Sequence, residues 1–191
     1  MRKPIVVVAA VAGSLAVGGG PQAAVTTLHV GDRVLLSGTT LGCNVSMFGG
    51  RPTAVCVKAI SGGVVKGSYG IVVSDRAVIA ARFTDSRGGN VEVYTRAQPA
   101  LDGPPLPSAK ASKQIYRMRL GDVIRVAGTH LAVAAERNPK GDATLGVFVA
   151  SRSFAPVPGT LAGGISSRDV AILQVTKSGA STVLFTRKHA K

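Results

Sequence analysis

Arginine is the residue type with the clearest chemical potential in this chain. The 191 residues include 23 Lys and Arg against 9 Asp and Glu, which gives a formal net charge of +14. A guanidinium fork suits phosphate and carboxylate groups, and a surface with this charge attracts polyanions. We predict an anion-binding role for the arginines that recur at matching places or share a predicted strand pair: Arg76, Arg96, Arg117, Arg119, Arg125, Arg168 and Arg187.

Other motifs do not point to catalysis or to a metal. The histidines His29, His130 and His189 have no Cys, His or carboxylate at ligand spacing, and we interpret each as a surface histidine. The chain has no nucleophile elbow, no Ser-x-x-Lys, no phosphate-binding Gly-x-x-x-x-Gly-Lys and no His-Glu-x-x-His. We therefore expect no catalytic residues, no metal and no cofactor.

The elements that position these residues are indicated by an internal repeat. The segment Val30–Leu41 (VGDRVLLSGTTL) returns at 120–131 as LGDVIRVAGTHL, and 73–79 and 94–96 match 165–171 and 185–187. The offset stays between 90 and 92, so the matches follow one order. They predict a module of roughly 70 residues in two copies, at 25–96 and 115–191. Four prolines between the copies predict an extended linker over 97–114.

Both cysteines fall in the first copy. Cys43 and Cys56 lie on either side of the Gly- and Pro-containing break at 48–52, which predicts a loop between two strands. The repeat aligns them with Val133 and Phe148, an apolar pair, so we predict that the two side chains face each other and form a disulfide. Two buried free thiols are the alternative.

Apolar and polar residues alternate with period two, which is typical of strands. Met118 and Leu120 alternate with arginines before Gly121, and Ile124 and Val126 follow it. A three-residue turn at 121–123 would place Leu120 opposite Ile124 and leave one face apolar. In this hairpin Arg119 and Arg125 face each other. A corner between two sheets satisfies the same pattern.

No segment has a helical period with caps, so the fold class is all-β: two tandem copies of an antiparallel module, as small barrels or a sandwich. Two architectures fit. Either each copy closes on its own core, or the copies pair about a pseudo-twofold axis and share one core. A module of this size is small for independent stability.

Residues 1–24 read as a secretory signal peptide: Arg2 and Lys3 precede an apolar run at 5–17 and then small residues. We expect a secreted or envelope-associated bacterial protein without a stable transmembrane segment after processing. The expected role is non-catalytic binding of anionic partners: a cell-wall polymer, a lipid headgroup or another polyanion. Nucleic acid has weak support, because the three tyrosines form no stacking platform. The alternatives are assembly through strand edges and, last, a secreted enzyme with an unrecognised site.

Overall fold

The computed structural model describes residues 27–87, 89–103 and 111–190. The predicted signal peptide at 1–24 and the centre of the predicted linker lie outside these residues. The described part is all-β, as the sequence predicts, and contains fifteen strands in two mixed sheets. None of its segments is a helix long and apolar enough to cross a membrane. We refer to residues 27–103 as the first half and to residues 111–190 as the second half.

The seven-stranded sheet takes all but one of its strands from the second half. Their order across the sheet is β1 (Thr27–Leu28), β10 (Val123–Val126), β11 (Leu131–Arg137), β12 (Ala143–Val149), β13 (Leu161–Ser166), β14 (Asp169–Val175) and β15 (Ser181–Lys188). The pairings are antiparallel except for β1 with β10.

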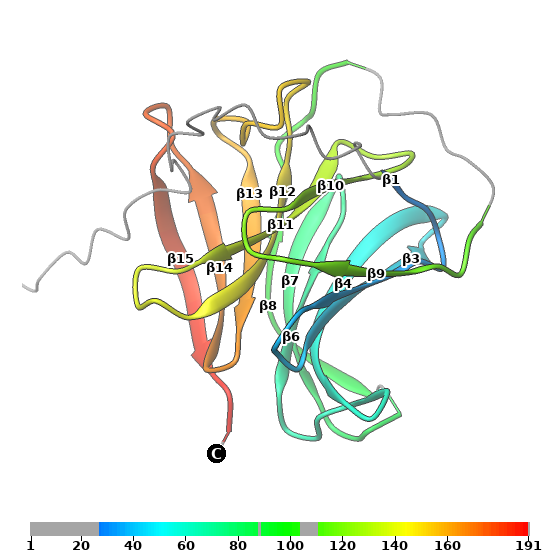
Figure 1. Cartoon of the computed structure of the whole chain (residues 1–191). Helices are drawn as coiled ribbons and strands as arrows, with labels where there is room; N and C mark the ends of the chain where they lie inside the picture. Colours follow the sequence, from blue (N-terminus) through cyan, green and yellow to red (C-terminus); the bar gives the residue numbers. More distant parts are fainter. Residues whose placement is uncertain (1–26, 88, 104–110, 191) are drawn as a thin grey trace, which may run out of the picture.

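The eight-stranded sheet is built in the same way from the first half. Its order is β8 (Asn90–Ala97), β7 (Ala77–Phe83), β6 (Tyr69–Val73), β4 (Arg51–Ile60), β3 (Leu41–Phe48), β2 (Arg33–Leu36) and β9 (Ile115–Met118), and the short β5 (Gly63–Val64) pairs with β4. Only β2 and β9 run parallel among these strands. Figure 1 shows β13 to β15 of the seven-stranded sheet on the left and β3 and β4 of the eight-stranded sheet on the right, with β1 and β10 of the seven-stranded sheet at the top right.

The two halves exchange their first strands. Strand β1 of the first half pairs with β10 of the second, through Thr27 and Arg125. Strand β9 of the second half pairs with β2 of the first, from Arg33 opposite Ile115 to Leu36 opposite Met118. The duplication itself remains a sequence prediction. The first and second halves nevertheless have the same order of strands across their sheets, and each has a register shift between its last two strands.

The hairpin predicted at 121–123 is wrong, and the alternative, a corner, is what the structure contains. Strands β9 and β10 belong to different sheets, so Arg119 does not face Arg125, and Leu120 lies exposed in the turn. The Asp122 carboxylate accepts a hydrogen bond from the Arg119 amide at 2.7 Å. This bond, together with the left-handed backbone of Gly121 (φ +95°), forms the turn that carries the chain from one sheet to the other.

The first half has a similar corner at Gly31 and Asp32, and more hydrogen bonds hold it than hold the corner at Gly121. Asp32 is fully buried, and its carboxylate accepts hydrogen bonds from the His29 amide at 2.8 Å and the Gln114 amide at 2.9 Å. Burial alone would raise the pKa of Asp32, but these hydrogen bonds outweigh it and lower the pKa. The segment that leads into β9 is therefore held against the first corner.

One hydrophobic core fills the space between the sheets and draws side chains from both halves, including Val34 and Ile71 from one and Leu131 and Ile165 from the other. The architecture with a shared core is thus the one observed, and neither sheet closes on itself. The inner faces approach most closely where β6 meets β13. A Cβ atom on Gly163 would overlap the side chain of Ile71, so any other residue there would require Ile71 to shift.

The predicted disulfide between Cys43 and Cys56 is present. The two residues lie directly opposite each other on β3 and β4, with both side chains buried in the core. The predicted match between Cys56 and Phe148 is wrong by one residue, because the position that corresponds to Cys56 is Val147. Val133 pairs with Val147, whereas Phe148 pairs with Ala132 and points to the outer face. In a strand, an error of one residue exchanges the two faces.

Candidate binding site on the outer face of the seven-stranded sheet

The outer face of the seven-stranded sheet, turned away from the core, is hollowed by a cavity of about 600 Å³. We call it the outer trough. It is lined by strands β12 to β15, by the end of β11 and by the loop residues 138–140. A hollow of this size falls in the range of small-molecule sites.

The floor of the outer trough is a row of very small residues. Gly146 pairs with Gly164, and Gly164 pairs with Ala171, so three neighbouring strands present almost no side chain. The corresponding row of the first half is Val55, Val72 and Ile79, which pair in the same succession. Branched side chains fill the row there, and glycines leave it open here.

The outer trough has one apolar and one polar wall. Phe148, Ala162 and Leu173 form the apolar wall and belong to a small hydrophobic cluster separate from the main core. On the other side of the glycine row, Glu136 pairs with Thr144 and Thr144 pairs with Ser166, which makes a polar row across three strands. Such a cleft suits a molecule with an apolar body and a polar group.

Glu136 is the most unusual residue of the polar wall. Burial raises the pKa of its carboxyl group. No described residue forms a hydrogen bond or ion pair with this carboxylate. One of its oxygens, Oε1, would lie 3.4 Å from a Cβ placed on Gly146, so the carboxylate lies over the glycine floor. A charged group in this state loses part of its hydration without compensation from the described residues.

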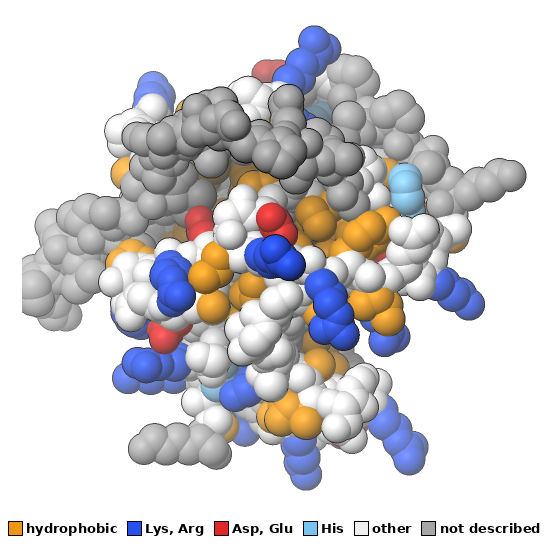
Figure 2. Space-filling view, viewed as in Figure 1, with side chains coloured by type: hydrophobic (Ala, Val, Ile, Leu, Met, Phe, Trp, Pro, Cys, Tyr) orange, Lys and Arg blue, Asp and Glu red, His pale blue; other side chains and the backbone are white. Residues whose placement is uncertain are grey.

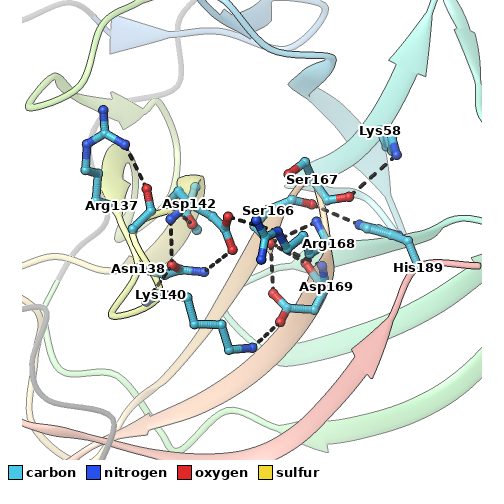
Figure 3. A network of polar contacts seen from close by, with 12 residues as sticks. Lys58, Arg137, Asn138, Lys140, Asp142, Ser166, Ser167, Arg168, Asp169 and His189 are labelled. Atoms are coloured by element: carbon cyan, nitrogen blue, oxygen red, sulfur yellow. Dashed lines mark hydrogen bonds and ion pairs between the residues drawn. The ribbon is translucent and has the colours of Figure 1, made fainter. Parts of the chain in front are cut away.

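A polar network that includes Lys140, Ser166 and Asp169 fixes the rim of the outer trough (Figure 3). Lys140 Nζ donates to Asp169 Oδ2 at 2.7 Å, and the Ser166 hydroxyl donates to Asp169 Oδ1 at 2.8 Å. Burial would raise the pKa of Asp169, but the hydrogen bonds from Lys140 and Ser166 lower it overall. Arg168 pairs with Asp142 at 3.2 Å. The loop after β11 is thereby tied to the turn between β13 and β14.

The predicted anion-binding arginines do not converge on one site. Arg117 lies on β9 in the eight-stranded sheet, and Arg125 lies on β10 in the other sheet. Figure 2 shows Lys and Arg side chains scattered over the visible face without a continuous basic patch. The backbone brings Arg76 near Arg96 and Arg168 near Arg187. In each pair the first arginine lies in a turn, and the second lies on the strand that pairs with the residues after that turn.

Arg125 has a structural partner. Its guanidinium donates to the carbonyl oxygens of Ser151 and Arg152, at 2.7 and 2.6 Å, and stacks 4.0 Å from the ring centre of Phe154. These contacts hold the loop between β12 and β13. The anion-binding role of the seven arginines stays a prediction.

The histidines are more enclosed than the sequence indicated: all three are partly buried. His130 Nδ1 lies 3.7 Å from Asp75 Oδ1, and His189 forms hydrogen bonds to both sheets. Among the described residues, no group of three or more His, Cys, Asp or Glu could hold a metal ion.

The outer trough was not identified from the sequence. The signal that could have found it lies in the repeat itself: one copy has glycine and alanine where the other has valine and isoleucine. Compared with protein-family models, with curated proteins and with solved structures, the chain matches none of them.

Proposed function

We propose that this protein is a non-catalytic binding protein that holds a small amphipathic molecule in the outer trough. The observation that carries the proposal is the open glycine floor between an apolar wall and a polar wall. The rim is already fixed by hydrogen bonds and ion pairs, so little ordering is required when a ligand enters.

The test is to fill the floor. In Gly164→Val, the new Cβ meets only the Thr144 methyl group at 3.7 Å, an ordinary contact, so the fold should tolerate the change. We expect the intact protein to bind the apolar dye Nile red with enhanced fluorescence, and the variant to lose most of that signal. Equal fluorescence from both proteins, with unchanged unfolding midpoints, would place the dye elsewhere and contradict the proposal.

A second candidate function is contact with an anionic lipid surface, and the tip of the β3–β4 hairpin favours it. Phe48 is 71% exposed and Met47 53% exposed, and Arg51 pairs with Phe48 across the turn. An apolar tip beside a cation suits the interface of an anionic bilayer. The net charge of +14 would add long-range attraction.

This candidate is tested by sedimentation with phosphatidylglycerol vesicles and with phosphatidylcholine vesicles. Binding should require the anionic lipid, fall as salt rises and weaken in Phe48→Ser. Ile60→Ser is the matched control, because Ile60 is also exposed but lies at the opposite end of β4. An equal loss in both variants would argue against a specific tip.

We also propose that the protein acts outside the cytoplasm, on the strength of the charge and apolar pattern of residues 1–24. Intact mass measurement of the protein recovered from each cell fraction tests this. A shortened, disulfide-bonded form is expected outside the cytoplasm. A full-length, reduced form inside the cell would overturn the proposed location.

A further inference from the structure

We propose that the ligand of the outer trough carries an ammonium group, which the carboxylate of Glu136 binds, while its apolar body lies against Phe148 and Leu173. This inference rests on the proposed function of the trough and adds the chemical class of the ligand.

The carboxylate of Glu136 lies over the glycine floor and has no partner among the described residues. The nearby basic residues are already engaged: Lys140 binds Asp169, Arg168 binds Asp142, and Arg137 donates to the Gly141 carbonyl at 2.7 Å. The described residues therefore supply partners for Asp142 and Asp169 and none for Glu136.

The identity of the missing partner follows from the chemistry of an ionised carboxylate. It can only accept hydrogen bonds, and a donor that is itself charged makes the strongest of them. An ammonium group contributes three donors and a compensating charge. A hydroxyl group supplies one donor and no charge, and an anionic head would be repelled.

The basic surface of the protein does not override this contact. At physiological salt, charges on the surface are screened over about 8 Å. The Glu136 carboxylate is partly withdrawn from water, where screening is weaker, and a ligand seated on the floor touches it directly. The remaining length of the ligand would lie along the apolar wall, where Leu173 and Val183 pair on adjacent strands.

The experiment compares three eight-carbon probes that differ only in the head group: octylammonium, 1-octanol and octanoate. Binding is followed by the methyl chemical shifts of Leu173 and Val183 in the intact, labelled chain, and dissociation constants come from the titrations. We expect octylammonium to bind about tenfold more tightly than 1-octanol, as one charge-assisted contact would give.

Three variants test whether the Glu136 carboxylate causes the difference in affinity between octylammonium and 1-octanol. Glu136→Gln should bring the affinity for octylammonium down to that for 1-octanol and leave 1-octanol unchanged. Glu92→Gln removes the same charge from the exposed strand β8 and should change neither affinity. Gly164→Val should abolish binding of all three probes.

Each other outcome is decisive. If 1-octanol binds as tightly as octylammonium, the outer trough is a binding site but the ammonium inference is overturned. Tightest binding of octanoate would overturn it as well and would point to the basic rim. If none of the probes shifts the trough methyl groups, the proposed function fails together with the inference.

Discussion

His189 ties the two sheets together through both nitrogens of its ring. Its Nδ1 accepts a hydrogen bond from the Tyr69 amide of β6 at 3.2 Å, and its Nε2 lies 2.9 Å from the Ser166 carbonyl oxygen of β13. The first half has a counterpart in Gln98, whose side chain bonds to both backbone groups of Leu161. The two side chains close the sandwich from opposite halves.

This contact predicts a pH dependence. Burial lowers the pKa of His189, so the folded state favours the neutral ring, whose Nδ1 can accept from Tyr69. The stability contributed by the ring is present above the unfolded pKa of about 6.5 and is lost as the pH falls towards the folded value. The free energy of unfolding in urea should decrease between pH 7.5 and 5. In His189→Gln, which copies Gln98, the decrease should be smaller.

Glu136 predicts an effect of the opposite sign. Its raised pKa means that ionisation costs stability in the folded state, a cost that is absent where the carboxyl is protonated in both states. Glu136→Gln should therefore raise the unfolding midpoint at pH 7.5 and have little effect at pH 4. A destabilised variant at neutral pH would show that the carboxylate has a partner and would weaken the argument for a ligand.

At the scale of elements, the two corners allow a matched comparison. Gly31 and Gly121 have φ values of +96° and +95°, so alanine at either position is strained by about 1–3 kcal/mol. Only at Gly31 would the new Cβ also overlap a backbone atom, the carbonyl oxygen of Ser112. Denaturant unfolding should show Gly31→Ala to be clearly less stable than Gly121→Ala. Equal losses would mean that the segment before β9 moves away easily.

The β3–β4 hairpin can be compared with its counterpart in the same manner. Cys43 and Cys56 are cross-linked where the other half places Val133 and Val147. Cys43→Ala should cost about 3 kcal/mol under oxidising conditions, from the lost constraint on the unfolded chain. Replacing both cysteines by valine should restore part of that loss through packing, as measured by urea unfolding without reductant.

At the scale of the whole molecule, the fit between the sheets depends on Ile71 and Gly163. Gly163→Ala should destabilise the protein by about 1–3 kcal/mol through overpacking. In an Ile71→Ala background the same change should cost much less, because the methyl group then has room, and a double-mutant cycle measures the coupling. Gly164→Ala, one residue along but facing the outer trough, is the control and should cost little.

Much of this architecture could be predicted from the sequence, because the period-two pattern of positions such as Ile124 and Val126 specifies strands and their buried faces. The same pattern is silent on which strands become neighbours. A hairpin and a corner at Gly121 produce the same alternation of apolar and polar residues. The exchange of β1 and β9 between the sheets was therefore not predictable from periodicity. The cysteine pair was predictable because loop signals marked a hairpin between its members.

The candidate site was not predicted. Gly163 and Gly164 resemble loop residues in the sequence, since glycine is uncommon inside strands. That Glu136 has no partner among the described residues also leaves no trace in composition or spacing, because it depends on which acids Lys140 and Arg168 bind. Pairing of side chains across strands has to be known before an unsatisfied carboxylate can be recognised.

The exchange of first strands has a consequence for ligand stoichiometry. A half-length chain with this topology would complete each sheet only by dimerising, and its two outer faces would then be identical. Joining both halves in one polypeptide keeps them together at any dilution through a high effective concentration. It also removes the symmetry requirement, so one face carries valines while the other carries glycines. Among the residues that the structure describes, only one of the two outer faces has this glycine floor, so the outer trough should saturate at one ligand per protein.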